Sequence, residues 1–242
     1  MEFHRGTYTT QSNNKKGNRE AETLMRNLET LATYASIWTD FKYPKQAIDD
    51  MWEDICLMQF HDCLPGSCIE MVYRDTDRLY KALFEKGAEI IEEASAALGI
   101  FSKPSERTSS VPHFVNYNHW PRTEILKVPK SSIGPGVQLN TQAIDDNETY
   151  VAASSFRGYD LTQGVALRQP PQAGIRELTG SVFILENDNI KVTVKGGAIT
   201  SLIFLQHNRE VIPQGKKANQ LVIYDDKPLY WQAWDVELYH FE

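Results

Sequence analysis

A histidine and an aspartate stand side by side in the stretch Gln-Phe-His-Asp-Cys-Leu-Pro-Gly-Ser, residues 59–67. Imidazole nitrogen and carboxylate oxygen are both common metal ligands, so His61 and Asp62 can serve a divalent cation. A carboxylate at the C-terminal end of a helix is electrostatically unfavourable and needs a positive or hydrogen-bonding partner. A metal ion, a histidine or a network of sugar hydroxyl groups would satisfy Asp62. The pair therefore predicts one wall of a metal site.

Three other interpretations of this stretch stay open. His61 can be a buried histidine that caps a helix end, because positive charge is favoured there. His61, Cys63 and Cys68 can form a local site, although their spacing matches none of the usual zinc patterns. A cysteine nucleophile would need a second histidine nearby, and no local signature ties one to Cys56, Cys63 or Cys68.

The elements that position these residues follow from the composition and the apolar pattern. The chain has 242 residues, 41% of them hydrophobic, which is enough to build a core. A net charge of -7 argues against nucleic acid or an anionic membrane as the main partner. No apolar run approaches the roughly 20 residues of a spanning helix. Three cysteines and no secretory signal at the N-terminus favour a reducing, cytosol-like compartment.

Three helices are predicted in the first hundred residues. The first begins after Asn18 as N-cap and ends near Trp38, and the second covers residues 45–62. Ser67 and Glu70 have the spacing of a capping box, which predicts the start of a third helix that continues to Gly99 with a possible bend at Gly87. Short links between helices predict an antiparallel bundle. Residues 6–10 are β-prone, and residues 11–17 are polar and predict a loop.

The second half of the chain is predicted to be all-β. Residues 101–110 have the composition of a linker, and turn residues then separate short alternating segments. The expected strands are residues 114–117, 123–128, 137–139, 149–153, 181–185, 190–194, 199–205 and 221–224. The predicted fold class is α+β and multidomain, with an antiparallel three-helix bundle followed by a β-sandwich or supersandwich portion.

Four stretches together resemble one family. Residues 59–67 resemble the signature of glycoside hydrolase family 38 α-mannosidases, in particular the fungal vacuolar and animal cytosolic branch. Residues 5–10, Arg-Gly-Thr-Tyr-Thr-Thr, resemble the segment that closes the family's catalytic domain. Residues 185–201 resemble the first long hairpin of its β domain, and residues 225–235 resemble its Trp-Asp-Ala-Trp-Asp motif. Gln232 departs from that motif by replacing an aspartate.

The resemblance implies an arrangement of domains and roles. Residues 1–17 would be the C-terminal remnant of an α/β catalytic domain, 18–100 the helical middle domain, 101–110 a linker and 111–242 the start of the β domain. His61 would be a ligand of a zinc ion, which cobalt can replace, and Asp62 would bind mannose hydroxyls. His4 would line the pocket. The nucleophile, the general acid and the other metal ligands would lie in the α/β domain, which is absent from this chain.

The resemblance thus implies a segment of a zinc-dependent, retaining α-mannosidase that acts on mannose-containing oligosaccharides. The intact enzyme would be a homo-oligomer in the cytoplasm or vacuole, with no nucleic acid or membrane partner, and the chain alone would be inactive. A second hypothesis is a non-catalytic scaffold or carbohydrate-binding module. A third, a cysteine enzyme, would lose its activity on thiol alkylation.

Overall fold

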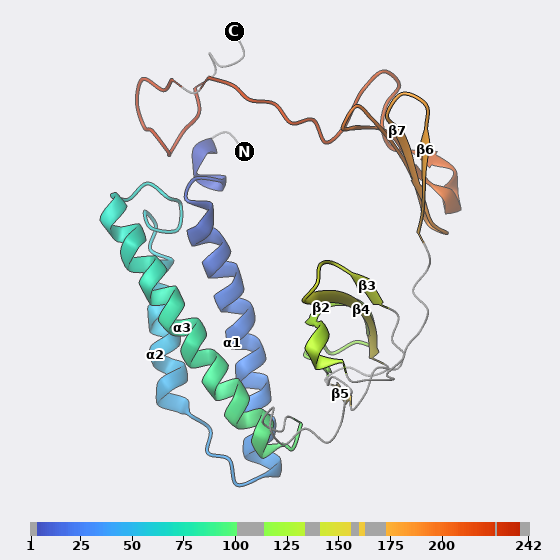
Figure 1. The fold of residues 1–242 in the computed structure, drawn as a ribbon. Helices are drawn as coiled ribbons and strands as arrows, with labels where there is room; N and C mark the ends of the chain where they lie inside the picture. Colours follow the sequence, from blue (N-terminus) through green and yellow to red (C-terminus); the bar gives the residue numbers. More distant parts are fainter. Residues whose placement is uncertain are drawn as a thin grey trace.

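A computed structural model describes residues 4–100, 114–133, 141–155, 160–162, 173–225 and 227–237. Three long helices, α1 (Ser12–Trp38), α2 (Lys45–Met58) and α3 (Glu70–Ala97), form a bundle. Helix α2 runs antiparallel to α1 and α3 (Figure 1). A short 3-10 turn, η1 (Arg5–Tyr8), precedes α1. The predicted helical bundle is therefore confirmed.

The core of the bundle is built from the apolar stripes of all three helices. Their spacing of three and four residues puts each stripe on one helix face, so the faces bury one another. The main cluster of buried side chains consists of Ala21, Met25 and Leu28 of α1, Ile48, Met51, Ile55 and Met58 of α2, and Tyr80, Leu83 and Ile90 of α3.

Two glycines let α1 and α3 approach each other closely. A Cβ at Gly17 would lie 2.7 Å from Cδ2 of the buried Tyr80 ring, and one at Gly87 would lie 2.6 Å from Cδ2 of Leu24. Helix α3 continues through Gly87 without interruption. The predicted weak point at Gly87 is thus a place where α3 makes room for a side chain of α1.

The helix boundaries differ from the predicted ones. Helix α1 begins at Ser12, seven residues before the expected start, because Asn14 and Gly17 are buried in its first turns. Residues 6–10, expected to be β-prone, contain η1 instead of a strand. Helix α2 ends at Met58, before His61 and Asp62. The pair consequently stands in the connection between α2 and α3 and not on a helix.

The predicted capping box is not formed. Helix α3 begins at Glu70 with Ile69 as N-cap, and no side chain caps it. The Glu70 carboxylate instead accepts hydrogen bonds from Arg74, at 2.7 Å from Nε and 2.6 Å from Nη2. Within the described part of the chain, the buried Ser67 hydroxyl finds no hydrogen-bond partner.

The described residues of the β region form three antiparallel sheets, which confirms the α+β class. A two-stranded sheet pairs β1 (Phe114–Asn116) with β5 (Asp160–Thr162). A three-stranded sheet has the order β2–β4–β3, formed by β2 (Arg122–Pro129), β4 (Glu148–Ser155) and β3 (Thr141–Ala143). The largest has the order β10–β9–β8–β7–β6, with β6 (Gly174–Leu178), β7 (Val182–Glu186), β8 (Ile190–Lys195), β9 (Ala198–Phe204) and β10 (Arg209–Glu210).

One of the predicted β segments is not a strand, and another lies outside the described residues. Residues 221–224 are extended but belong to no strand, and Leu221 and Ile223 are almost fully exposed at 96% and 98%. The segment 137–139 and the linker 101–110 lie outside the described residues. After residue 220 the chain returns to the end of the bundle where α1 begins (Figure 1).

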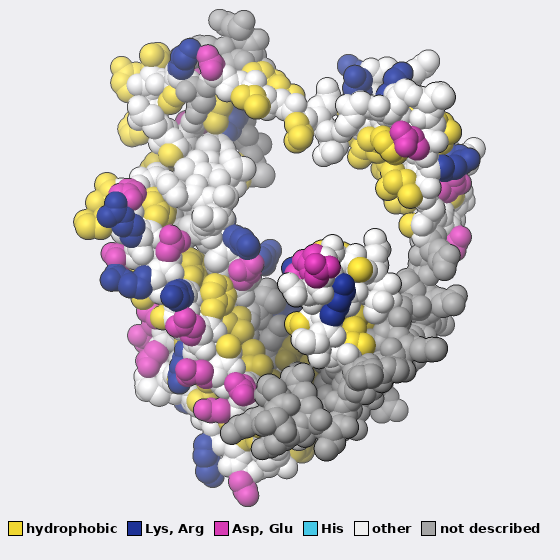
Figure 2. All heavy atoms as spheres, in the orientation of Figure 1, with side chains coloured by type: hydrophobic (Ala, Val, Ile, Leu, Met, Phe, Trp, Pro, Cys, Tyr) yellow, Lys and Arg dark blue, Asp and Glu magenta, His cyan; other side chains and the backbone are white. Residues whose placement is uncertain are grey.

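The surface of the bundle combines mixed charge with a local apolar patch. Figure 2 shows acidic and basic side chains interspersed over the helices. Large apolar side chains are exposed around the α2–α3 connection, namely Leu57, Phe60, Ile69 and Met71. No helix in the described parts of the chain has the length and hydropathy needed to cross a membrane.

Candidate functional site

The α2–α3 connection, residues 59–69, is a compact series of turns. The backbone N–H of Cys63 donates to the carbonyl oxygen of Phe60 at 2.8 Å, and that of Gly66 donates to Cys63 at 3.2 Å. Gly66 has φ 101°, a conformation that side chains with a Cβ rarely adopt. Its Cβ position is also only 2.7 Å from the carbonyl oxygen of Thr10. The Pro-Gly pair therefore shapes this connection and lets it pack against the segment before α1.

His61 is accessible from solvent. Its side chain is 75% exposed and tilts against the ring of Phe60, with ring centroids 4.3 Å apart. Its Nε2 lies 3.6 Å from Oδ2 of Asp62. The alternative of a buried histidine that caps a helix is wrong, because His61 is neither buried nor in a helix. The imidazole is open to a ligand or to another part of the protein.

The two carboxylate oxygens of Asp62 have different surroundings. Oδ2 faces His61, and the side chain as a whole is 39% exposed. Oδ1 is buried and has no hydrogen-bond partner within the described residues. A buried carboxylate oxygen without a partner is costly, so this atom is suited to accept a hydrogen bond or to bind a cation.

Two side chains at the start of α1 hold the connection in place. Nδ2 of the buried Asn14 donates to the carbonyl oxygen of Cys63 at 2.8 Å. The Lys15 ammonium donates to three carbonyl oxygens, of Thr10 at 2.6 Å, Leu64 at 2.9 Å and Pro65 at 3.0 Å. Burial lowers the pKa of Lys15. Both residues lie in the segment 11–17, which was predicted to be a polar loop, and no local sequence pattern reveals contacts between positions 49 residues apart.

The cysteines of this region do not form the alternative metal site. Cys63 is buried, and burial raises the pKa of its thiol, with the neighbouring Cys68 as a further cause. A raised pKa leaves less of the reactive thiolate at neutral pH. Among the described residues, no group of three or more His, Cys, Asp or Glu side chains has the arrangement of a metal site. The local site of His61, Cys63 and Cys68 is therefore not formed.

His4 lies at the same end of the bundle and contacts the C-terminal segment. Its exposed ring meets Trp234 edge-on, with centroids 4.8 Å apart and an interplanar angle of 75°. The Trp234 indole N–H donates to Nδ1 of His4. Figure 1 shows that the N-terminus, the α2–α3 connection and the C-terminal segment gather at one end of the bundle. His4 therefore lies at the same end of the bundle as the connection that carries His61 and Asp62.

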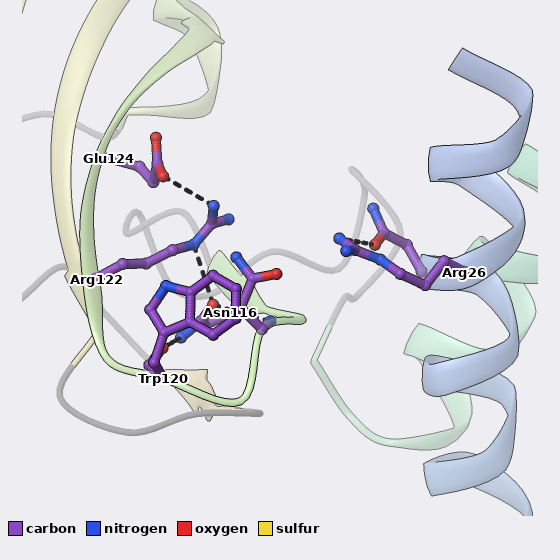
Figure 3. A network of polar contacts seen from close by, with 7 residues as sticks. Arg26, Asn116, Trp120, Arg122 and Glu124 are labelled. Carbon is purple, nitrogen blue, oxygen red and sulfur yellow. Dashed lines mark hydrogen bonds and ion pairs between the residues drawn. The ribbon is translucent and has the colours of Figure 1, made fainter. Parts of the chain in front are cut away.

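A second polar network lies away from this end and fixes the turn before β2. Oδ1 of the buried Asn116 accepts from Arg122 Nε at 3.0 Å, and its Nδ2 donates to the carbonyl oxygen of Trp120 at 2.8 Å. Arg122 also donates to Glu124 at 2.8 Å. Figure 3 shows Arg26 of α1 opposite this network, with its guanidinium bonded to the neighbouring Asn27 and not to Arg122 or Glu124. These hydrogen bonds hold the turn before β2 in place, which is a structural role.

Comparison with known proteins decides the family. The profile of the alpha mannosidase middle domain matches residues 2–98, and that of the glycosyl hydrolases family 38 C-terminal domain matches residues 185–242. The chain belongs to glycoside hydrolase family 38. The predicted resemblance to family 38, including its animal cytosolic and fungal vacuolar branch, is confirmed.

Family 38 relatives match along the whole chain. It is 35% identical over 244 residues to alpha-mannosidase 2C1 of Mus musculus, covering 100% of this chain and 22% of that protein. It is 33% identical to an alpha-mannosidase of Saccharomyces cerevisiae, covering 99% of this chain and 19% of that protein. The chain thus spans about a fifth of the length of these relatives.

A solved structure of the family supports the fold. The crystal structure of an alpha-mannosidase from Enterococcus faecalis V583 superimposes with a TM-score of 0.59 at 15% sequence identity. The match covers 85% of this chain and 29% of that chain. A bundle followed by antiparallel sheets is therefore an arrangement found in the family.

Proposed function

We propose that this chain supplies His61 and Asp62 to the active site of a zinc-dependent, retaining α-mannosidase that hydrolyses terminal α-mannosyl residues of oligosaccharides. One observation carries the proposal: an exposed imidazole stands beside a carboxylate whose Oδ1 is buried without a partner among the described residues. Membership of family 38 supports the reaction class.

The donor set fits a zinc ion only in part. An imidazole and a carboxylate are suitable zinc ligands, and the orphaned Oδ1 of Asp62 needs a positive or hydrogen-bonding partner. No third ligand joins them within the described residues. The remaining ligands are therefore expected on the family's α/β catalytic domain. Zinc, or cobalt in its place, would act there as a Lewis acid on adjacent sugar hydroxyl groups.

The proposed role of this chain's residues is to bind the metal ion and to orient the substrate. His61 would present a neutral imidazole nitrogen to the metal, a role that its 75% exposure permits. Asp62 would accept hydrogen bonds from mannose hydroxyls at its half-exposed carboxylate, and hydrogen bonds to a carboxylate are strong and directional. His4 would contribute to substrate binding at the edge of the site, in the orientation that Trp234 gives its ring.

The carboxyl groups that cleave the glycosidic bond are not assigned to this chain. A retaining glycosidase uses two carboxyl groups about 5 Å apart, one as nucleophile and one as general acid and base. We assign neither role to a residue of this chain and expect both on the α/β catalytic domain. This domain is also the expected cover for the apolar patch of Leu57, Phe60, Ile69 and Met71, because large exposed apolar patches mark interaction surfaces.

The domain division, assembly and location follow the same proposal. The middle domain would include all of α1 from Ser12 and end near residue 100, so the expected remnant of the catalytic domain, residues 1–17, would be shorter than the sequence predicted. Residues 111–242 would begin the β domain after the linker 101–110. The complete enzyme would be a homo-oligomer in the cytoplasm or the vacuole. The 242-residue chain alone would have no mannosidase activity, because His61 is its one proposed metal ligand and a single ligand cannot hold the ion in place.

Substitution of Asp62 tests the proposal in an enzyme that joins this chain to the α/β domain. Asp62→Asn keeps the shape of the side chain and removes its charge, so kcat/KM on an aryl α-mannoside should fall by about tenfold or more. Asp146→Asn, at an exposed turn residue, is the matched control. Unchanged turnover by Asp62→Asn would contradict the assignment. Metal-independent binding of oligosaccharide by the isolated chain would favour a carbohydrate-binding module instead.

A further inference from the structure

The two ends of the described chain are joined by direct contacts. The backbone N–H of Gly6 donates to the carbonyl oxygen of Trp234 at 3.1 Å. The backbone N–H of Arg5 donates to Oδ1 of Asp235 at 3.4 Å, across 230 positions of sequence. We call this set of contacts, made by His4, Arg5 and Gly6 with Trp234 and Asp235, the terminal clasp. It fixes the turn η1 relative to the C-terminal segment.

The clasp is closely fitted on both sides. A Cβ at Gly6 would lie 3.0 Å from the carbonyl oxygen of Ala233 and 3.2 Å from the carbonyl carbon of Trp234, so a side chain there would force the two segments apart. The Trp234 ring meets His4 edge-on and donates its indole N–H to that ring. Asp235 Oδ1 also accepts from the backbone N–H of Val236 at 3.0 Å, which orients the carboxylate.

The backbone around the clasp is strained. Trp231 and Ala233 have φ values of 61° and 66°, and His4 has 56°. Residues with a Cβ adopt this left-handed region at a cost in free energy, so surrounding contacts must maintain it. The hydrogen bonds from the N–H groups of Trp234 and Asp235 to the carbonyl oxygen of Trp231, both 3.0 Å, supply part of that support. Strained segments of this kind tend to occur at functional sites.

A short series of hydrogen bonds connects the clasp with the α2–α3 connection. The carbonyl oxygen of Gly6 accepts from the Thr10 hydroxyl at 2.6 Å. The carbonyl oxygen of Thr10 accepts from Lys15 Nζ at 2.6 Å, and the same amine donates to Leu64 at 2.9 Å. Gly66 packs against Thr10 as well. Movement of η1 would therefore be transmitted to the backbone two residues after Asp62.

We infer that Trp234 and Asp235 are positioning residues for the His61–Asp62 loop, acting through η1, Thr10 and Lys15. They act on the placement of that loop and are not proposed to contact His61 or Asp62. The predicted effect on catalysis rests on the proposed function, whereas the predicted effect on the structure does not. Loss of the Asp235 acceptor should loosen both η1 and the loop.

Three variants in an enzyme that contains this chain separate the possibilities. Asp235→Ala removes the acceptor, and Asp235→Asn keeps an amide oxygen at the same place. Asp225→Ala, in the same C-terminal segment but paired with the exposed Lys227, is the matched control. Amide hydrogen exchange is measured in peptides covering residues 4–10 and 60–67, together with kcat and KM on an aryl α-mannoside.

Asp235→Ala should increase exchange about tenfold or more in both peptides, the ratio expected for loss of one charge-assisted hydrogen bond. It should lower kcat more than it changes KM, and Asp235→Asn should restore most of both effects. Faster exchange confined to residues 4–10, with residues 60–67 and kcat unchanged, would overturn the inference. If the unsubstituted enzyme has no mannosidase activity, the proposed function fails while the exchange in residues 60–67 still decides the positioning role.

Discussion

The side-chain amide of Asn14 donates to the main-chain carbonyl oxygen of Cys63 at 2.8 Å, joining the first turn of α1 to the connection that carries His61 and Asp62. Asn14 is 3% exposed, so water cannot replace this bond. The placement of the candidate site consequently depends on a polar contact between two segments that are distant in sequence. Such a contact is sensitive to removal, because a buried group left without its partner pays its full desolvation cost.

Asn14→Ala should lower the free energy of unfolding by about 1–3 kcal/mol, since the carbonyl of Cys63 would stay buried without its donor. Urea unfolding of the 242-residue chain should show a lower midpoint with an unchanged slope. Asn13→Ala, one residue earlier on the exposed side of the helix, is the control and should change stability little. Equal effects of the two substitutions would contradict the buried role of Asn14.

Gly17→Ala should destabilise the bundle although alanine is the better helix former. The substitution gains about 1 kcal/mol of helix propensity. Its Cβ, however, would lie 2.7 Å from the buried ring of Tyr80, and overpacking of a core costs about 1–3 kcal/mol. Thermal unfolding should show a lower Tm for Gly17→Ala and no loss for Thr33→Ala on the exposed face of α1. A higher Tm for Gly17→Ala would contradict the close packing of Gly17 against the Tyr80 ring.

Tyr80→Phe and Tyr73→Phe should have opposite consequences. The Tyr80 hydroxyl is buried with no hydrogen-bond partner in the described structure, and burial raises its pKa to about 12. Its removal should leave stability unchanged or raise it by up to about 1 kcal/mol. The Tyr73 hydroxyl accepts from the backbone N–H of Cys68 at 2.8 Å, so its loss should cost about 1 kcal/mol. Equal losses in chemical unfolding would disprove this difference.

Glu210 should make the stability of the large sheet depend on pH. Its carboxylate accepts from the Ser201 hydroxyl at 2.5 Å and from the backbone N–H of Leu202 and Ile212, each at 2.9 Å, and these bonds lower its pKa. A lowered pKa in the folded state means that the contribution is present above the ordinary value of 4.5 and is lost as the pH falls through the folded-state pKa.

The measurement for Glu210 compares unfolding of the unsubstituted chain and Glu210→Gln over an acid pH series. The unsubstituted chain should be more stable at neutral pH, and the difference should shrink below pH 4.5. Glu177→Gln in the edge strand β6 controls for the change in net charge. A difference that is constant with pH would exclude the proposed ionised hydrogen-bond acceptor.

The sequence predicted the presence of the helices better than their ends. Apolar positions such as Met25 and Leu28 reveal the buried face of α1 directly, because their spacing matches the helix period. Asn14 and Gly17 belong to the same buried face but are polar or lack a side chain. Their burial depends on Cys63 and Tyr80, which come from distant parts of the chain. Periodicity cannot detect partners of that kind.

The β region and the candidate site also depend on tertiary contacts that the sequence pattern does not reveal. Residues 221–224 have the composition of a strand, yet a strand also requires a hydrogen-bonding neighbour, and the described residues provide none. The types of His61 and Asp62 indicated a metal site, but the exposure of the imidazole and the orphaned Oδ1 of Asp62 are tertiary properties. The capping box is not formed because α3 begins at Glu70 with Ile69 as its N-cap, so Ser67 lies two residues before the N-cap position.

The most direct test of the proposed metal site is the metal content of the enzyme formed by this chain and the α/β domain. Purified unsubstituted enzyme, His61→Ala and His119→Ala are compared by elemental analysis and by turnover of an aryl α-mannoside. We predict that His61→Ala loses its tightly bound zinc and more than about 100-fold of its activity, above the loss typical for an outer partner of a metal ligand. His119→Ala should retain both. Stoichiometric zinc and near-normal turnover in His61→Ala would contradict the account.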